Sequence, residues 1–227
     1  MRFVIEVLRP IALLLSRIFF KIQFHRVENV PKEGACILTP NHESFADPIW
    51  ITIPIKRRVR YMAWERFFRV PVLGTVMRVF GAFPVKLETT DTAAQREAIE
   101  LIKSGNLLVI FPEGGRTKTG KLMPFKAGAF RLALTHGVPI VPVTIDGGYA
   151  IWSIHRLLPR PGRLTITYHP PIYTEQFSAN GGRIEMKEQA RELARQTRAV
   201  VASALDPANI ENYIETQTNP LKDNIST

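Results

Sequence analysis

The feature that most constrains this chain is the alternation of short apolar runs with helical patterns. The strongest strand pattern, at residues 107–111, follows an amphipathic helical pattern at residues 92–103 that ends before Gly105. Other strand-like runs lie at residues 21–26, 35–39, 59–63, 82–86, 140–145 and 164–168, and further helical patterns begin near residue 45 and at residues 72–80, 127–135 and 182–205. This order predicts an α/β fold with a largely parallel or mixed central sheet flanked by helices.

The chain is long enough for one sizeable core. Its 227 residues are 45% hydrophobic, and no internal repeat or linker divides them. We expect an N-terminal interfacial membrane helix at residues 1–24, one main domain at residues 25–205 and a loose polar C-terminal tail at residues 206–227. Pro142 interrupts the run at residues 140–145, so we expect an edge or bulged strand there.

The N-terminal segment is apolar but carries charges. The longest uninterrupted apolar run, residues 11–15, is far shorter than the ~20 residues of a spanning helix, and no cleavage site typical of a signal peptide follows. Apolar residues at helical spacing alternate with arginines, which is typical of an amphipathic helix lying in a membrane interface. The alternative is a helix packed on the protein's own core.

The charge balance points to an anionic partner. The chain has 30 Lys and Arg against 20 Asp and Glu, for a net charge of +10. Such a surface attracts anionic lipid, an acidic protein or nucleic acid. No nucleic-acid recognition motif is present, so nucleic-acid binding is the less favoured alternative. The single cysteine, Cys36, excludes an intramolecular disulfide and a cysteine-based zinc site, and its apolar surroundings predict burial.

Two loops carry residues suited to chemistry. Residues 41–47 follow one strand-like run and contain His42 and Asp47, and residues 111–116 follow another. If the two strands are parallel neighbours, both loops emerge at the carboxyl edge of the sheet, where ligands bind in open α/β folds.

His42 and Asp47 are spaced as a general base and the carboxylate that orients it. A carboxylate on one ring nitrogen leaves the other free to accept a proton from a substrate hydroxyl. The alternative is structural, because Ser44 and Asp47 also have the spacing of a helix capping box. No Gly-x-Ser-x-Gly motif occurs, which favours direct attack by a substrate hydroxyl over a covalent acyl-enzyme.

The second loop suits an anion. Backbone amides of Gly114 and Gly115, with Arg116, can hold a phosphate, although an ordinary glycine turn is the alternative. Residues 115–121 nearly match a nucleotide-binding P-loop. Leu122 lacks the hydroxyl that holds magnesium, and Pro124 falls where a helix should begin, which counts against that interpretation.

Together these motifs resemble the glycerolipid acyltransferase family, which makes phosphatidic acid from lysophosphatidic acid. The H-x-x-x-x-D motif is met by His42 and Asp47, and residues 111–116 are similar to F-P-E-G-[TS]-R with Gly115 in the Thr or Ser position. A G-x-F-x-x-R block resembles residues 81–86 with Lys86 in the Arg position, and residues 138–143 are similar to V-P-[IV]-[IV]-P-V. The resemblance covers roughly residues 25–170.

The resemblance implies a 1-acylglycerol-3-phosphate O-acyltransferase of phospholipid biosynthesis. His42 would be the general base and Asp47 its partner, and the acceptor's glycerol phosphate would be bound by Glu113, Gly114, Gly115, Arg116, Lys86 and Lys126. Acyl-CoA or acyl carrier protein would supply the acyl group, with no cofactor and no metal. The enzyme would work at the cytoplasmic face of an anionic membrane, with lysophosphatidic acid as its lipid partner and no nucleic acid.

Lys86 and Gly115 keep other acceptors open. Lysine lacks the planar bidentate grip of arginine on phosphate. The alternatives are the same chemistry on glycerol-3-phosphate or a lyso-aminolipid, and a non-catalytic membrane scaffold that keeps the fold.

Overall fold

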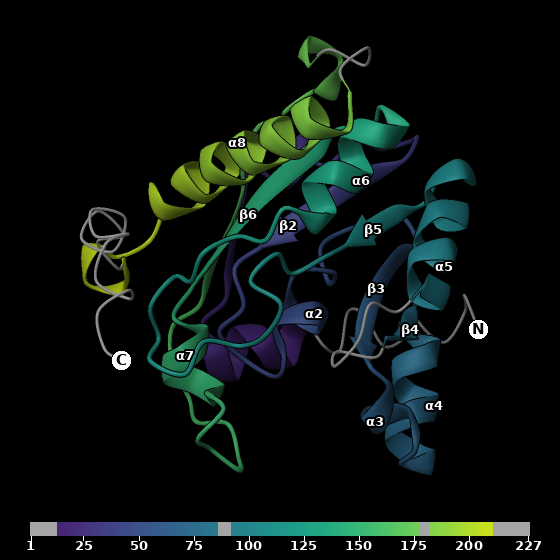
Figure 1. The fold of residues 1–227 in the computed structure, drawn as a ribbon. Coiled ribbons are helices and arrows are strands. Elements are labelled where there is room, and N and C mark those ends of the chain that lie inside the picture. Colours follow the sequence, from purple (N-terminus) through teal and green to yellow (C-terminus); the bar gives the residue numbers. More distant parts are fainter. Residues whose placement is uncertain (1–12, 86–91, 178–181, 211–227) are drawn as a thin grey trace, which may run out of the picture.

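A computed structural model describes residues 13–85, 92–177 and 182–210. In these residues a seven-stranded sheet with the order β1-β7-β6-β2-β5-β3-β4 lies between layers of helices (Figure 1). The strands are β1 (Gln23–His25), β2 (Cys36–Pro40), β3 (Val59–Trp64), β4 (Ala82–Val85), β5 (Leu107–Val109), β6 (Ile140–Asp146) and β7 (Thr165–Tyr168).

The sheet is mixed, as expected from the sequence. Strands β6, β2, β5, β3 and β4 are parallel to one another, β7 pairs antiparallel with β6, and β1 runs parallel to β7. Each parallel neighbour requires a crossover, and the intervening helices supply it. The prediction of an α/β domain with a largely parallel or mixed sheet is therefore confirmed.

Helices cover both faces of the sheet. The labelled helices are α2 (Asp47–Trp50), α3 (Glu65–Phe68), α4 (Pro71–Val79), α5 (Thr92–Lys103), α6 (Gly128–His136), α7 (Gly148–Trp152) and α8 (Arg183–Ala202), with 3-10 turns η1 (Val27–Asn29), η2 (Thr174–Gln176) and η3 (Pro207–Asn209). One face packs against α5, α6 and α8, while α2, α7 and a helix at residues 13–20 lie toward the other (Figure 1).

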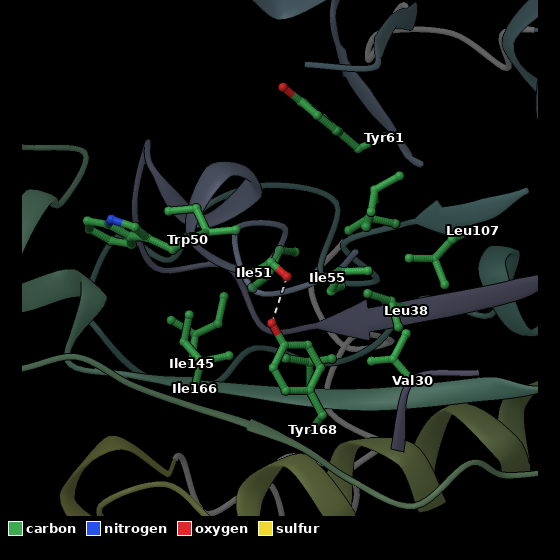
Figure 2. Packing of buried hydrophobic residues seen from close by; sticks show 14 of the residues in the cluster. Val30, Leu38, Trp50, Ile51, Ile55, Tyr61, Leu107, Ile145, Ile166 and Tyr168 are labelled. Carbon is green, nitrogen blue, oxygen red and sulfur yellow. Dashed lines mark hydrogen bonds between the residues drawn. The ribbon is translucent and has the colours of Figure 1, made fainter. Parts of the chain in front are cut away.

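Side chains of the central strands alternate between two cores. In β2, Ile37 belongs to the cluster with α5, α6 and α8, and Leu38 belongs to the opposite cluster. Figure 2 shows the second cluster, in which the hydroxyl of Tyr168 on β7 donates to the carbonyl of Ile51 at 2.6 Å. Burying each large apolar side chain contributes about 1.5–3 kcal/mol, so both cores fix the sheet on which the loops stand.

The expectation for residues 140–145 was wrong. β6 is an interior strand between β7 and β2, and it is neither an edge nor bulged. The carbonyl of Pro142 accepts from the His169 amide on the β7 side, at the end of that ladder. The N–H and C=O of one strand residue point to the same side. The N–H that Pro142 lacks would therefore point toward β7, at the end of that ladder, and its absence does not disturb the pairing with β2.

The two ends of the chain are described only in part. Residues 1–12 lie outside the described residues, as do residues 211–227, so the predicted division at residues 24 and 206 stays a prediction. Residues 206–210 are not loose: the Leu122 amide donates to the Asn209 carbonyl at 2.9 Å, and Ile210 packs beside Leu122. Within the described ranges, no helix is long and apolar enough to cross a bilayer.

Candidate active site

The structure brings the two motif loops together at one edge of the sheet. Strands β2 and β5 are parallel neighbours, so the loops that follow them leave the same edge. The His42 amide donates to Oε1 of Glu113 at 2.9 Å, and the Thr117 amide donates to the His42 carbonyl at 2.9 Å. Both backbone groups of His42 are therefore held by the second loop and by Thr117, the residue that follows it.

The His42 and Asp47 side chains form the expected pair. Nδ1 of His42 lies 2.8 Å from Oδ2 of Asp47, whose side chain is fully buried. With the Nδ1 proton directed at the carboxylate, the neutral ring carries its lone pair on Nε2.

Asp47 also stabilises the loop around it. Its Oδ2 accepts from the amides of Glu43 at 2.6 Å and Ser44 at 2.8 Å, while the Ser44 hydroxyl accepts from the Ala46 amide at 2.9 Å. The bond from the Ser44 amide is the one that a capping box would make. The contact with the His42 ring that the catalytic interpretation predicts and the contact with the Ser44 amide that the structural one predicts are both present. Both involve Oδ2 of Asp47.

The His42 ring is fixed on its face as well. It stacks on Phe111 with the ring centroids 3.9 Å apart and the planes inclined by 26°. The side chain remains 16% exposed. A ring fixed by Asp47, by Phe111 and through its own backbone is preorganised to present Nε2 to a substrate.

Glu113 is buried and already hydrogen-bonded to the backbone, unlike a side chain with oxygens free to bind a substrate. It is buried, and its carboxylate oxygens accept from the amides of His42 at 2.9 Å and Met123 at 3.4 Å. Burial raises the pKa of Glu113 to about 8, against the lowering effect of those two amides. These contacts make Glu113 the link between the two loops, and its predicted contact with substrate stays a prediction.

Gly114 makes room for Lys126. Its φ is +75°, and a Cβ added to it would lie 2.5 Å from Nζ of Lys126. The Lys126 amide donates to the Pro112 carbonyl at 2.8 Å, which fixes the lysine over the loop. Gly115 has open space around it, so a threonine or serine would fit there.

Arg116 lies close enough to Asp47 to feel its charge, and one nitrogen of its guanidinium is unpaired among the described residues. Its guanidinium carbon lies 3.4 Å from the centroid of the Phe45 ring, a cation–π contact. Burial lowers the pKa of Arg116 while the charge of Asp47 raises it. Its buried Nη1 has no hydrogen-bond acceptor among the described residues, which leaves that N–H for an anionic ligand.

Lys86, the remaining predicted site residue, lies outside the described residues. Strand β4 ends one residue earlier, at Val85. Its predicted contact with the acceptor stays a prediction. Among the described residues, no group of His, Cys, Asp and Glu could hold a metal ion.

Sequence reasoning missed the residues that attach the His42 loop to β6 and α7. The Asn41 amide group donates to the Ile145 carbonyl at 2.8 Å and accepts from the Ile145 amide at 2.7 Å. Oε2 of Glu43 accepts from the Tyr149 amide at 3.0 Å. Burial, and next the charge of Asp47, raises the pKa of Glu43 well above its usual range. Asn41 and Glu43 are the sequence neighbours of His42, and this position was the one sequence feature that could have indicated their role.

Sequence reasoning also missed Gly148. A Cβ there would lie 3.2 Å from both Oδ1 of Asp47 and Oε2 of Glu43, so the start of α7 packs closely on the two carboxylates. The pair Gly147–Gly148 directly follows β6, the strand beside β2, and glycines at that edge indicate a close backbone approach.

The fold and this geometry define an α/β protein that holds a histidine–aspartate pair beside a basic, glycine-rich loop. A family model described as "Acyltransferase" matches residues 21–146, more than half of the chain. The chain belongs to the acyltransferase family. The match contains both motif loops and the strands that carry them.

Individual relatives agree with the family. The chain is 34% identical over 161 residues to a chloroplastic 1-acyl-sn-glycerol-3-phosphate acyltransferase of Brassica napus, a match that covers 68% of this chain and 46% of that protein. It is 26% identical over 158 residues to a 1-acyl-sn-glycerol-3-phosphate acyltransferase of Bacillus subtilis, covering 69% and 76%. The chain thus spans about half the length of the plant relatives that it matches.

A solved structure has the same fold. The crystal structure of the 1-acyl-sn-glycerophosphate (LPA) acyltransferase PlsC of Thermotoga maritima superimposes with a TM-score of 0.64 at 27% identity. The similarity covers 87% of this chain and 83% of that one.

Proposed function

We propose that this protein transfers a fatty acyl group from acyl-CoA or acyl carrier protein to the free hydroxyl of 1-acylglycerol-3-phosphate, giving phosphatidic acid. The observation that carries the proposal is the 2.8 Å contact between Nδ1 of His42 and Oδ2 of Asp47, beside a loop in which Nη1 of Arg116 has no acceptor among the described residues. Relatives named for this reaction at 26–34% identity support it.

The chemistry follows from the ring orientation. Nε2 of His42 removes the acceptor's hydroxyl proton as the oxygen attacks the thioester carbonyl carbon. The tetrahedral intermediate collapses, the C–S bond breaks, and the imidazolium returns its proton to the leaving thiolate. Asp47 stabilises the imidazolium between these two proton transfers.

The acceptor's phosphate would lie at the second loop. Arg116, on the loop tied to His42, has an N–H without an acceptor among the described residues, and Lys126 holds its ammonium close to Gly114 of the same loop. A phosphate bound there would place the glycerol hydroxyl toward Nε2. Competition by headgroup analogues separates lysophosphatidic acid from glycerol-3-phosphate or a lyso-aminolipid as the acceptor.

We also propose that the protein works at the cytoplasmic face of a membrane. The helix at residues 13–20 packs on the core through Leu13 and Phe20. It leaves four large apolar side chains exposed, at Leu14, Leu15, Ile18 and Phe19. An exposed apolar face flanked by basic residues suits a helix seated in the acyl boundary of an anionic leaflet.

The test is acyl transfer from a labelled acyl thioester to lysophosphatidic acid in mixed micelles. We expect activity in the wild type and a loss of at least about a hundredfold in His42→Ala, since the general base is removed. Asp47→Asn should lose a similar factor, because the amide no longer stabilises the imidazolium. A folded His42→Ala variant that retains robust transfer would refute the assignment of the base.

A further inference from the structure

The loop between α7 and β7 exposes an apolar tip inside a basic segment. Leu157 is 90% exposed and Leu158 is 73% exposed. No carboxylate occurs between Asp146 and Glu175, whereas the loop carries exposed basic side chains at His155, Arg156, Arg160 and Arg163. Adjacent exposed leucines are costly in water and mark an interaction surface.

The tip projects from a base that is fixed by hydrogen bonds. The Arg156 amide donates to the Ser153 carbonyl at 3.1 Å, and the Arg160 amide donates to the Ile151 carbonyl at 3.1 Å. The Nε of Arg160 also donates to the Ala150 carbonyl. These bonds hold residues 156 and 160 against the end of α7, so the two leucines between them lie at the tip of a projecting loop.

The base of this projection is joined to the C-terminal end of the helix at residues 13–20. The Gly162 amide donates to the Phe19 carbonyl at 3.3 Å, which joins the two elements directly. Figure 1 shows the loop extending past α7 at the same end of the molecule as that helix. The exposed apolar residues of the helix and the leucines of the loop therefore belong to one end of the protein.

The same end carries the candidate active site. Trp152 of α7 packs against Phe45 with the ring centroids 5.5 Å apart, and Phe45 also carries the Arg116 guanidinium. At the other end of α7, the Tyr149 amide binds Glu43 in the His42 loop. The projection is thus tied through one short helix to the loop that holds the base.

We propose that Leu157 and Leu158 insert among the acyl chains of an anionic phospholipid bilayer while the neighbouring arginines contact headgroup phosphates. An apolar tip surrounded by cations, with no carboxylate in the segment, matches the charge and depth profile of that surface. With the helix at residues 13–20 it gives a second point of contact, which orients Phe45 and Arg116 toward the lipid. The inference rests on the membrane association proposed above.

A fluorescent probe tests the insertion directly. Leu158→Cys carries an environment-sensitive nitrobenzoxadiazole dye, and the buried native Cys36, whose pKa burial raises to about 12, stays unlabelled. With vesicles of phosphatidylcholine and phosphatidylglycerol, we expect a blue shift and protection from iodide quenching. Ile184→Cys is the matched control, because Ile184 is 81% exposed at the start of α8, on the opposite side of the sheet, and should show neither change.

A double substitution measures the contribution of the tip. We expect Leu157→Ser with Leu158→Ser to weaken co-sedimentation with these vesicles at least about tenfold, since two leucines lose their apolar burial. Ile184→Ser should leave binding unchanged. Acyl transfer to a short-chain lysolipid below its critical micelle concentration should persist in the double variant, which separates a failure of this inference from a failure of the proposed reaction.

Two results would overturn the inference. An unchanged probe at residue 158 in the presence of bound vesicles would show that the loop stays in water. Protection of that probe before vesicles are added would show that the tip is covered by another part of the chain or by a second copy. Light scattering would distinguish these two, because it measures the molar mass and therefore the oligomeric state.

Discussion

At the scale of single residues, Asp47 shows how one side chain can serve both structure and chemistry. One of its oxygens accepts from the His42 ring and from two backbone amides, so the group that shapes the loop also orients the proposed base. The other oxygen is buried without a hydrogen-bond donor among the described residues, next to Gly148. A buried oxygen without a hydrogen-bond donor costs free energy, and such oxygens are found at functional sites, which agrees with the role proposed for Asp47.

Gly114 and Gly115 form a matched pair for mutation. Gly114→Ala must adopt a positive φ and must push the Lys126 ammonium aside, so we expect a loss of about 1–2 kcal/mol in the free energy of unfolding and a raised KM for the phosphate-bearing acceptor. Gly115→Ala meets open space and should change little. Thermal unfolding and steady-state kinetics measure both. Equal effects at the two positions would contradict this account of the Lys126 contact.

At the scale of elements, two loops from neighbouring strands act as one unit because Glu113 connects them. Its carboxylate reaches the backbone of His42 in the first loop and of Met123 beyond the second. Arg198 of α8 donates to the Leu122 and Met123 carbonyls at 2.9 and 3.0 Å, so the segment that follows the second loop is fixed to α8. The site therefore depends on elements far apart in sequence.

The raised pKa of Glu113 predicts a pH-dependent stability. Between its ordinary value of 4.5 and about 8, the folded state keeps a proton that the unfolded state has released. The unfolded state binds fewer protons in this window, so the free energy of unfolding falls as pH rises, by an amount on the order of 5 kcal/mol across the window.

Glu113→Gln removes that titration. Its carbonyl can still accept from the His42 amide, and we expect its stability to fall less than that of the wild type between about pH 4.5 and 8. Glu43, whose pKa is also raised, is present in both proteins. The charge of Glu113 is the smallest of the causes that raise the pKa of Glu43, so most of the Glu43 contribution cancels in the comparison. Denaturant melts at several pH values measure the difference, and parallel stability curves for the two proteins would contradict the assigned proton.

At the scale of the whole molecule, the net charge of +10 predicts salt-dependent membrane binding. Because exposed charges are screened over about 10 Å at 0.1 M salt and about 3 Å at 1 M, binding to anionic vesicles should weaken severalfold or more over this range. Binding to vesicles of phosphatidylcholine alone should change much less. A salt titration by co-sedimentation measures both, and no dependence with anionic vesicles would exclude an electrostatic contribution.

Much of the fold followed from local patterns. The alternation of apolar runs and helical periods predicted the strands and the long helices, and residues 92–103 were predicted with the bounds that α5 has. The position of β6 was not predictable from Pro142, because whether a missing N–H matters depends on which neighbour it faces. Likewise, the attachment of residues 206–210 depends on a contact with Leu122, distant in sequence.

By itself the sequence determined the fold class and the two motifs, because periodicity, turn residues and the His42–Asp47 spacing are local properties of the chain. Only the tertiary structure decided how these parts work together. It placed Glu113 between the loops, Phe111 against the His42 ring and Gly162 beside the helix at residues 13–20. Such contacts depend on strand order and on which side each backbone group faces, and residues far apart in sequence meet only after the sheet has formed.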